Sequence, residues 1–281
     1  MQKEEGKNVF YSHISKNKIR RRVAVSEVLE LMKTTARLAG KIALERRKNF
    51  SASQVYAKGT PADLVTDVDR ELEKFIIAKL KAATPDYGFY GEEYGKENGD
   101  AEWCYCIDPI DGTTNFVHGS VVFTVSIALL HNGEFYAGAV YAPQLDELYY
   151  AERGQGAFLN GEKIYASKCT SLAQALCSTG FACIRAQVKE NNLKHFVKIL
   201  PQLQGIRRTG SAAFDLCQVA AGRNDGYWEF CLQPYDIAAG ALIALEAGAV
   251  FTDAAGGKDY PGKGVVCAAP GIHGLLCREL N

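Results

Sequence analysis

The densest group of chemically useful side chains is the segment 103–115, which reads Trp-Cys-Tyr-Cys-Ile-Asp-Pro-Ile-Asp-Gly-Thr-Thr-Asn. Its apolar start predicts a strand that delivers Asp108 at its end, and Pro109 should keep that strand from continuing in the middle of a sheet. The chain must then turn, which brings Asp111 back toward Asp108. Gly112 lets a ligand approach the main chain closely, and the amide groups of such a turn suit an oxyanion such as phosphate. An ordinary Asx turn would account for one aspartate but not for the whole string.

Further acidic residues flank this segment at three places in the chain. One group precedes a predicted helix, one follows a predicted strand that ends at Tyr90, and one acid lies in the first turn of an apolar helix. These acids are Asp63, Asp67 and Asp69, then Glu92 and Glu93, then Asp236. Taken alone, Asp236 is an ordinary partner of the helix dipole. If the carboxylates converge, cations must relieve their repulsion, and Mg²⁺ is the first choice. Such a site beside a phosphate-binding turn indicates metal-assisted phosphoryl transfer to water.

Composition places the chain among soluble globular proteins. It has 281 residues, of which 47% are hydrophobic and 23% charged, with no net charge. No apolar run is long enough to span a membrane, and no secretory signal is visible, so we expect a cytoplasmic protein. The nine cysteines form no ligand pattern, which argues against a disulfide scaffold and against zinc.

The order of elements predicts two halves. Helices are expected at 24–48 and 67–81, followed by strands of a largely antiparallel sheet at 87–90, 103–107, 121–130, 134–141 and 147–151. A hairpin turn is expected at 131–134. The second half should alternate helices at 190–199, 212–221 and 235–247 with strands near 226–230, 249–252 and 264–268. We therefore expect a flexible N-terminal extension over 1–22, a half over 23–165 that carries most metal ligands, and a half over 166–281 that carries Asp236 and the contacts to the substrate ring.

The combined motifs resemble those of the inositol monophosphatases from about residue 24 to the C-terminus. The matching segments are Asp63-Leu-Val-Thr-x-x-Asp69, Gly91-Glu92-Glu93, Asp108-Pro-Ile-Asp-Gly-Thr-Thr-Asn-Phe116 and Tyr235-Asp236-x-Ala-x-Gly240. The resemblance implies an α+β fold of the layered αβαβα sandwich type. It also implies two to three Mg²⁺ ions per active site, lithium sensitivity, a homodimer, and hydrolysis of myo-inositol monophosphate.

Residue by residue, the resemblance assigns roles to the acidic motifs. It implies metal ligation by Glu92, Asp108, Asp111, Asp236 and the Ile110 carbonyl. Asp69 and Thr113 match the pair that orients the attacking water, with Glu92 as a third catalytic residue. Substrate contacts are implied for Asp111, Gly112, Thr113, Gly210, Ser211, Ala212, Glu229 and Asp236. Lys58 matches a basic residue in a mobile loop beside the metals, and Asp67 receives no catalytic role.

Several alternatives remain open. Fructose 1,6-bisphosphate, NADP or a nucleotide 3′-phosphate could replace inositol phosphate, because the metal motifs recognise only the phosphate ester. A transcription-associated binding role is another alternative, since some bacterial relatives act that way. The basic run near the N-terminus, from Lys16 to Arg22, could contact nucleic acid but equally suits a solvated terminus. No dinucleotide or Walker loop is present, and a covalent aspartyl mechanism at Asp67 is disfavoured because a helix follows at once.

Overall fold

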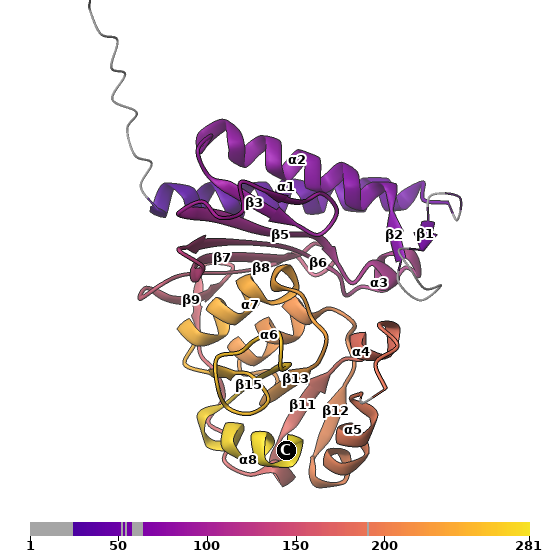
Figure 1. The fold of residues 1–281 in the computed structure, drawn as a ribbon, viewed down its shortest axis with the longest axis vertical. Coiled ribbons are helices and arrows are strands. Elements are labelled where there is room, and N and C mark those ends of the chain that lie inside the picture. Colours follow the sequence, from indigo (N-terminus) through magenta and orange to yellow (C-terminus); the bar gives the residue numbers. More distant parts are fainter. Residues whose placement is uncertain (1–24, 52, 54, 58–63, 190) are drawn as a thin grey trace, which may run out of the picture.

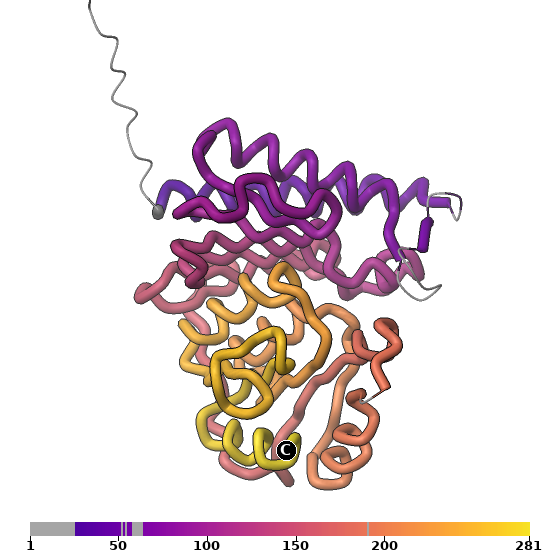
Figure 2. The backbone as a smooth tube through the Cα atoms, viewed as in Figure 1, coloured from indigo at the N-terminus to yellow at the C-terminus, as the bar shows by residue number. Residues whose placement is uncertain are grey.

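The computed structural model describes residues 25–281 apart from 52, 54, 58–63 and 190. Figure 2 traces the backbone of these residues. The N-terminal extension 1–22, Lys58 and Asp63 lie outside the described residues. In the part that is described, no helix is both long and apolar enough to cross a membrane.

Two long helices form the first layer of the molecule. They are α1 (Val25–Lys48) and α2 (Asp67–Ala83), close to the predicted bounds. The apolar face of α1 is fully buried at Val28, Met32, Ala36 and Ala39, which recur at the three- and four-residue steps of an amphipathic helix. Both helices cover one face of the first sheet (Figure 1).

An eight-stranded sheet, in the order β10-β9-β8-β7-β6-β5-β3-β4, forms the second layer. Its strands are β3 (Gly88–Gly91), β4 (Gly95–Glu97), β5 (Trp103–Asp111), β6 (Thr124–His131), β7 (Glu134–Ala142), β8 (Glu147–Glu152), β9 (Gly156–Leu159) and β10 (Glu162–Ile164). Only β3 and β5 pair in parallel, so the largely antiparallel prediction is confirmed. The hairpin between β6 and β7 turns at Asn132 and Gly133, which both have positive φ as a tight hairpin requires.

The prediction that β5 ends before Pro109 is wrong. The strand continues to Asp111 alongside β6, beyond the end of its pairing with β3 at Ile107, because a bulge takes Pro109, which has no N–H, out of the regular ladder. Asp108 pairs with Ser126 and Asp111 pairs with Thr124, so the two residues between them have no partner in the register. The bulge therefore sets the relative positions of Asp108 and Asp111.

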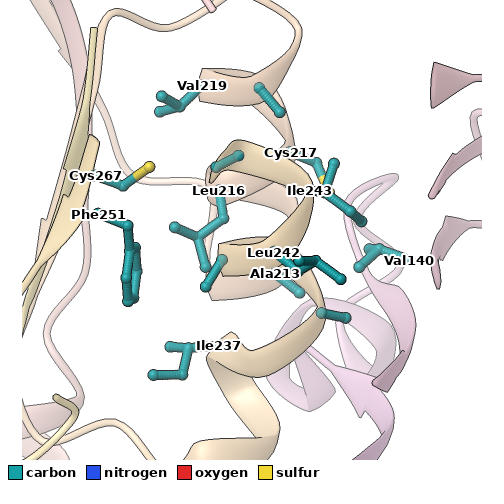
Figure 3. Packing of buried hydrophobic residues seen from close by; sticks show 14 of the residues in the cluster. Val140, Ala213, Leu216, Cys217, Val219, Ile237, Leu242, Ile243, Phe251 and Cys267 are labelled. Carbon is teal, nitrogen blue, oxygen red and sulfur yellow. The ribbon is translucent and has the colours of Figure 1, made fainter. Parts of the chain in front are cut away.

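Two helices form the middle layer and pack against both sheets. They are α6 (Ala212–Ala220), which is buried throughout, and α7 (Pro234–Glu246), which is buried from Ile237 to Ala244. Figure 3 shows their side chains between Val140 of the first sheet and Phe251 and Cys267 of the second. Small residues such as Ala239 allow close packing, since the backbone of α7 lies against Gly138 of β7.

A five-stranded mixed sheet and an outer helical layer complete the fold. The sheet order is β12-β11-β13-β15-β14, and α5 and α8 cover its outer side (Figure 1). These elements are β11 (Leu176–Thr179), α4 (Ala182–Arg185), α5 (Leu193–Ile199), β12 (Gly205–Arg207), β13 (Gly226–Glu229), β14 (Val250–Thr252), β15 (Val265–Ala268) and α8 (Pro270–Leu280). The predicted αβαβα sandwich is confirmed.

Several short elements were not predicted. They include the hairpin of β1 (Val55–Ala57) and β2 (Leu64–Thr66), the edge strands β4, β10 and β12, and the C-terminal helix α8. Most are three or four residues long, too short for a periodic pattern. All nine cysteines are free thiols, and most of them are buried, as expected. The division at 165/166 stays a proposal; the first sheet ends at Ile164 and the second begins at Leu176.

Candidate active site

The turn after β5 is built around Gly112. This residue has φ of 99° and precedes the short helix α3 (Thr113–Val117). A Cβ here would lie 3.2 Å from the carbonyl oxygen of Gly210, so both the backbone angle and the space favour glycine. Asn115 ties the turn to the second half, because its Nδ2 donates to the carbonyls of Val122 and Thr209, both at 2.7 Å.

Thr113 and Asp69 form a hydrogen-bonded pair across two elements. Asp69 is fully buried in the first turn of α2, where its Oδ2 accepts from the backbone N–H and the hydroxyl of Thr66 in a capping box. Its Oδ1 faces the hydroxyl of Thr113 at 3.1 Å. The same hydroxyl lies 3.2 Å from the Ile110 carbonyl, so its single proton has two acceptors. Burial raises the pKa of Asp69 to about 7.

Asp108 and Asp111 are both buried, with 2% and 8% of their surface exposed. Oδ1 of Asp108 accepts from the backbone N–H of Ile110 at 3.0 Å. Oδ2 of Asp111 accepts from the Ser211 hydroxyl at 2.6 Å and from the Ala213 N–H at 2.7 Å. Hydrogen bonds within the protein therefore hold both carboxylates in place without a ligand.

Asp236 and Glu92 complete the acidic group. Asp236 lies in the first turn of α7, where its Oδ2 accepts from the Gln233 N–H at 2.6 Å. Burial and the charge of Asp111 raise the pKa of Asp236 well above its usual range. Burial and the charge of Glu92 do the same to the pKa of Asp108. Burial also raises the pKa of Asp111 to about 6. The four carboxylates are thus close enough to repel one another.

The donor chemistry of this group fits a hard divalent cation. All four side chains offer oxygen, and removing their charges from water without a counter-ion is costly. In the part of the chain that the structure describes, no three side chains of Asp, Glu, Cys or His lie close enough together to form a complete metal-binding set. The four carboxylates are candidate metal ligands because of their oxygen donors and because their neighbouring charges raise the pKa values of Asp108 and Asp236.

Glu73 is a functional candidate that the sequence reasoning missed. This buried residue of α2 accepts from the backbone N–H groups of Glu93 at 2.8 Å and Tyr94 at 3.1 Å. It therefore anchors the turn that carries Glu92. A Cβ on Gly91 would lie 1.8 Å from the Glu73 carboxylate, which explains the glycine before the two glutamates. Only the helical spacing of Glu73 from Asp69 could have drawn attention to it.

The residues expected to contact a substrate ring lie on the second half of the chain. Ser211 caps α6, accepting from the Phe214 N–H at 3.2 Å, and Ala212 follows it. Glu229 is buried, and its oxygens accept from the Ala182 N–H at 2.9 Å and the Tyr227 hydroxyl at 2.8 Å. Gly210 lies against Asn115. Ser211 and Glu229 thus have protein partners in addition to any ligand contact.

A cavity of about 270 Å³ lies beside the acids and could receive the body of a substrate. Glu92, Asp236 and Tyr235 line one part of it, and Arg185 and Cys231 line another. Arg185 brings positive charge to the cavity. This arrangement can bind divalent cations, a phosphate group and an attached organic group side by side.

Comparison with known proteins decides the family. The sequence model of the inositol monophosphatase family matches residues 24–281. The chain belongs to this family. This places it among the phosphatases, which are phosphoric monoester hydrolases. The phosphatase is 41% identical to the inositol-1-monophosphatase of Mesorhizobium japonicum, over 88% of this chain and 92% of the relative.

Other relatives of the phosphatase carry a different name. It is 41% identical to Nus factor SuhB of Vibrio cholerae, over 89% of this chain and 94% of that protein. Among solved structures, the extragenic suppressor protein SuhB of Bartonella henselae matches with a TM-score of 0.85 and 39% identity, covering 90% of this chain and 98% of the other. The inositol monophosphatase of Thermotoga maritima matches with a TM-score of 0.82 and 34% identity, covering 91% and 97%.

The raised pKa values predict how stability depends on pH. The pKa of Asp69 rises from 3.8 to about 7, and burial raises that of Glu73 from 4.5 to about 7. Folding therefore favours the protonated forms of Asp69 and Glu73. The stability that these groups contribute is fully present below their pKa values in the unfolded chain and is lost as pH rises through about 7. We expect the Tm of the chelator-treated phosphatase to fall between about pH 4.5 and 7, the interval between the unfolded and folded pKa values, at ~2–4 °C per kcal/mol lost.

Differential scanning fluorimetry measures this dependence. The variant Glu73→Gln should show a flatter fall, because one of the two titrating groups is absent. Saturating Mg²⁺ should also flatten it by favouring ionised carboxylates. A Tm that rises with pH across this interval in chelator would contradict the prediction.

Proposed function

We propose that the chain is a Mg²⁺-dependent phosphomonoesterase that hydrolyses myo-inositol monophosphate to inositol and phosphate by direct attack of water. The observation that carries this proposal is the grouping of Glu92, Asp108, Asp111 and Asp236 beside the turn at Gly112. The names of relatives, which include inositol-1-monophosphatases, support the choice of substrate.

The proposed roles follow the resemblance. Glu92, Asp108 and the Ile110 carbonyl would hold one Mg²⁺, whereas Asp108, Asp111 and Asp236 would hold a second. Glu92 would contribute to a third. Bound Mg²⁺ would neutralise phosphate charge and lower the pKa of water. The chain's own residues then have three tasks. The Thr113 hydroxyl orients the water while donating a hydrogen bond to Asp69. The amides after Gly112 bind phosphate oxygens, and the segment 210–212 with Glu229 holds the ring.

A phosphate-release assay over a panel of esters tests the proposal. The panel contains myo-inositol 1-phosphate, fructose 1,6-bisphosphate, NADP and a nucleotide 3′-phosphate, each with Mg²⁺ and with chelator. We expect the highest kcat/KM on inositol phosphate and no release in chelator. A higher value on another ester would transfer the assignment to that substrate. Full activity of a metal-stripped sample would reject the mechanism. Lithium inhibition belongs to the same proposal and is read in the same assay.

A substitution at Glu229 tests recognition of the ring. We expect Glu229→Gln to lower kcat/KM on inositol phosphate by about 10- to 100-fold, because a hydrogen bond to a charged group contributes ~1.5–3 kcal/mol. Turnover of 4-nitrophenyl phosphate should fall much less, since that substrate has no ring hydroxyl. The aryl substrate also controls for the loss of the bonds from Ala182 and Tyr227. Equal losses on both substrates would mean that Glu229 acts only by supporting the fold.

A transcription-associated role is a second candidate because several relatives are named Nus factor SuhB. A role of this kind depends on surface contacts, so it should survive the loss of the metal carboxylates. A cell that depends on the protein and carries only Asp108→Asn decides between the two. Normal growth with no phosphatase activity would favour the partner role.

We also propose a cytoplasmic homodimer that associates through the region of α4 and α5. This region exposes five apolar side chains, which is typical of an interface. They are Ile184, Val188, Leu193, Val197 and Leu200. Val197 is 68% exposed, so Val197→Asp should not disturb folding. Analytical ultracentrifugation should give a dimer for the original chain and a monomer for the variant.

A further inference from the structure

A second cavity, of about 400 Å³, lies next to the proposed active site and shares no lining residue with the cavity beside the acids. Its walls come from both halves of the chain: residues of β3, β4 and β5 and of the β6–β7 hairpin from the first half, and the start of α7 with the segment 258–261 from the second. Cavities of about 300–1,000 Å³ are typical of small-molecule sites. No role in the proposed phosphate chemistry falls on this cavity.

An aromatic contact separates the two cavities. Tyr90 lines the larger cavity, Tyr235 lines the smaller one, and their rings meet edge to face with centroids 5.7 Å apart. Pro234 and Ile237 of α7 line the larger cavity on either side of Asp236. A molecule bound in the larger cavity would therefore touch the helical turn that holds Asp236 without entering the acidic group.

One wall of the larger cavity suits a flat apolar group. The ring of Phe135 stacks on that of Tyr260 with centroids 5.9 Å apart, and Phe251 supports Tyr260 edge to face at 4.8 Å. Leu130 and Ile237 continue the apolar lining. These ring contacts fix the orientation of Phe135 and Tyr260, so both rings offer a fixed surface on which an aromatic ligand can stack.

The polar part of the cavity is positively charged. Lys96 and Lys258 line it, and both side chains are exposed. Within the described residues, neither lysine forms a salt bridge, and the Nζ of Lys96 lies over the ring of Tyr90 at 4.9 Å. The acid in the lining, Glu134, is 3.6 Å from Arg153, which offsets its charge. Two ammonium groups thus face the cavity with their charge available to a ligand.

Nearby acids outside the lining are engaged elsewhere for the most part. Glu97 pairs with Lys81, and Asp259 pairs with Lys263 at 3.3 Å. Burial raises the pKa of Cys104, Lys96 lowers it, and Asp100 adds a smaller upward shift. The charged residues that line the cavity are Lys96, Lys258 and Glu134, so the lining carries a net positive charge.

We propose that this cavity is a binding site for a small anion with an aromatic body. The apolar part of the ligand stacks against Phe135 and Tyr260, and its sulfonate, carboxylate or phosphate group pairs with Lys96 and Lys258. The site is distinct from the acidic group, which repels anions unless cations are bound there. Its ligand is therefore recognised without divalent metal.

The probe that tests this site is 8-anilino-1-naphthalenesulfonate, whose fluorescence rises in apolar surroundings. The full chain is titrated with the probe in chelator and again in Mg²⁺. We expect one saturable site in chelator. The neutral analogue N-phenyl-1-naphthylamine has the same aromatic body without the sulfonate, so it isolates the contribution of the lysines.

Charge reversal at the two lysines gives the decisive comparison. We expect Lys96→Glu/Lys258→Glu to raise the Kd of the sulfonate probe at least tenfold, about 1.4 kcal/mol, and to leave that of the neutral analogue unchanged. Lys79→Glu, on the exposed side of α2, is the matched control and should change neither value. Because all three lysines are exposed, these variants should fold normally, which circular dichroism checks.

Three results would overturn the proposal. The first is the same Kd for the sulfonate probe in the double variant and the original chain. The second is a titration without saturation, which indicates adsorption to scattered apolar surface. The third is displacement of the probe by inositol phosphate at the concentration that half-saturates catalysis, because that would put the probe in the substrate cavity. A failed phosphatase assay alone leaves these binding measurements unaffected, so the two proposals are tested separately.

Discussion

The substitution Asp108→Asn is expected to lower phosphatase activity by about 10³-fold or more. The metal-free variant should be at least as stable as the original chain. Asp108 is buried among Glu92, Asp111 and Asp236, whose charges raise its pKa. In the proposed mechanism it touches two cations, and a metal ion supplies several kcal/mol of charge stabilisation, with each 1.36 kcal/mol worth about tenfold in rate. Asparagine keeps the oxygen that accepts from the Ile110 N–H, so the turn should retain its shape.

The effect on stability separates this explanation from simple misfolding. Removing the buried Asp108 carboxylate from a group of four lowers both repulsion and desolvation cost, so the Tm in chelator should stay equal or rise. The increase in Tm on adding Mg²⁺ should be lost, because the variant binds the ion weakly. Asp67→Asn is the matched control, since Asp67 is exposed at the start of α2 and has no assigned role. A variant that keeps both its activity and its Mg²⁺-dependent rise in Tm would contradict the metal assignment.

Local sequence signals were sufficient to identify most of the candidate site. Asp108, Asp111 and Gly112 lie in one continuous segment. Asp69 lies in the first turn of an amphipathic helix, and Asp236 lies in the first turn of a largely apolar one. Their chemistry is therefore visible in short windows of the chain. The layered sandwich followed from the resemblance of the motifs as a set, since the periodicity alone predicted only two halves.

Contacts between distant segments could not be predicted in the same way. Glu73 bonds to amides about twenty residues later, and Asn115 reaches the carbonyl of Thr209 on the other half. Nothing in the local sequence distinguishes such a glutamate or asparagine from one on the surface. The bulge at Pro109 is a related case: proline disfavours a regular central strand, but only the pairing with β6 shows that the strand continues around it.

The hydrogen-bond partners of Glu229 could not be predicted from the sequence either. The sequence places it at the end of a strand, where a substrate contact is reasonable. The fold adds the Ala182 N–H and the Tyr227 hydroxyl as donors, so the carboxylate already supports α4. A polar residue can therefore carry a structural and a binding role together, and only a comparison of substrates separates them.

The second large effect is expected at the pair of Thr113 and Asp69. Thr113→Ala and Asp69→Asn should each lower kcat by about 10²–10⁴-fold, the usual contribution of positioned general-base assistance, while KM changes little. The Thr113 hydroxyl donates to Asp69 at 3.1 Å, which leaves its oxygen lone pairs to accept from the attacking water. The double variant should lose little more than either single variant, because both residues serve one water.

The protonation state of Asp69 adds a pH signature to this pair. In the ionised form, Oδ2 of Asp69 accepts from Thr66 and Oδ1 accepts from Thr113, whereas a proton on Oδ1 would make that oxygen a donor toward Thr113. Burial raises the pKa of Asp69 to about 7 when no cation is present. We expect kcat at limiting Mg²⁺ to fall as pH drops below about 7, and this acid limb to move to lower pH as Mg²⁺ increases. Asp69→Asn should abolish the limb. An acid limb that stays fixed at all Mg²⁺ concentrations would show that another group titrates.

Two further measurements separate catalysis from folding and from a covalent route. Asp69 is the N3 residue of the capping box that begins α2 at Thr66, so Asp69→Asn can change stability, and rates must be compared well below the Tm of the variant. Thr113→Ser keeps the hydroxyl and should retain most of the activity. Hydrolysis of a phosphate ester made chiral with oxygen isotopes should invert the configuration at phosphorus, because one displacement by water inverts it. Retention, or a trapped phosphoenzyme, would require a protein nucleophile and would reject the role of Thr113 in orienting water.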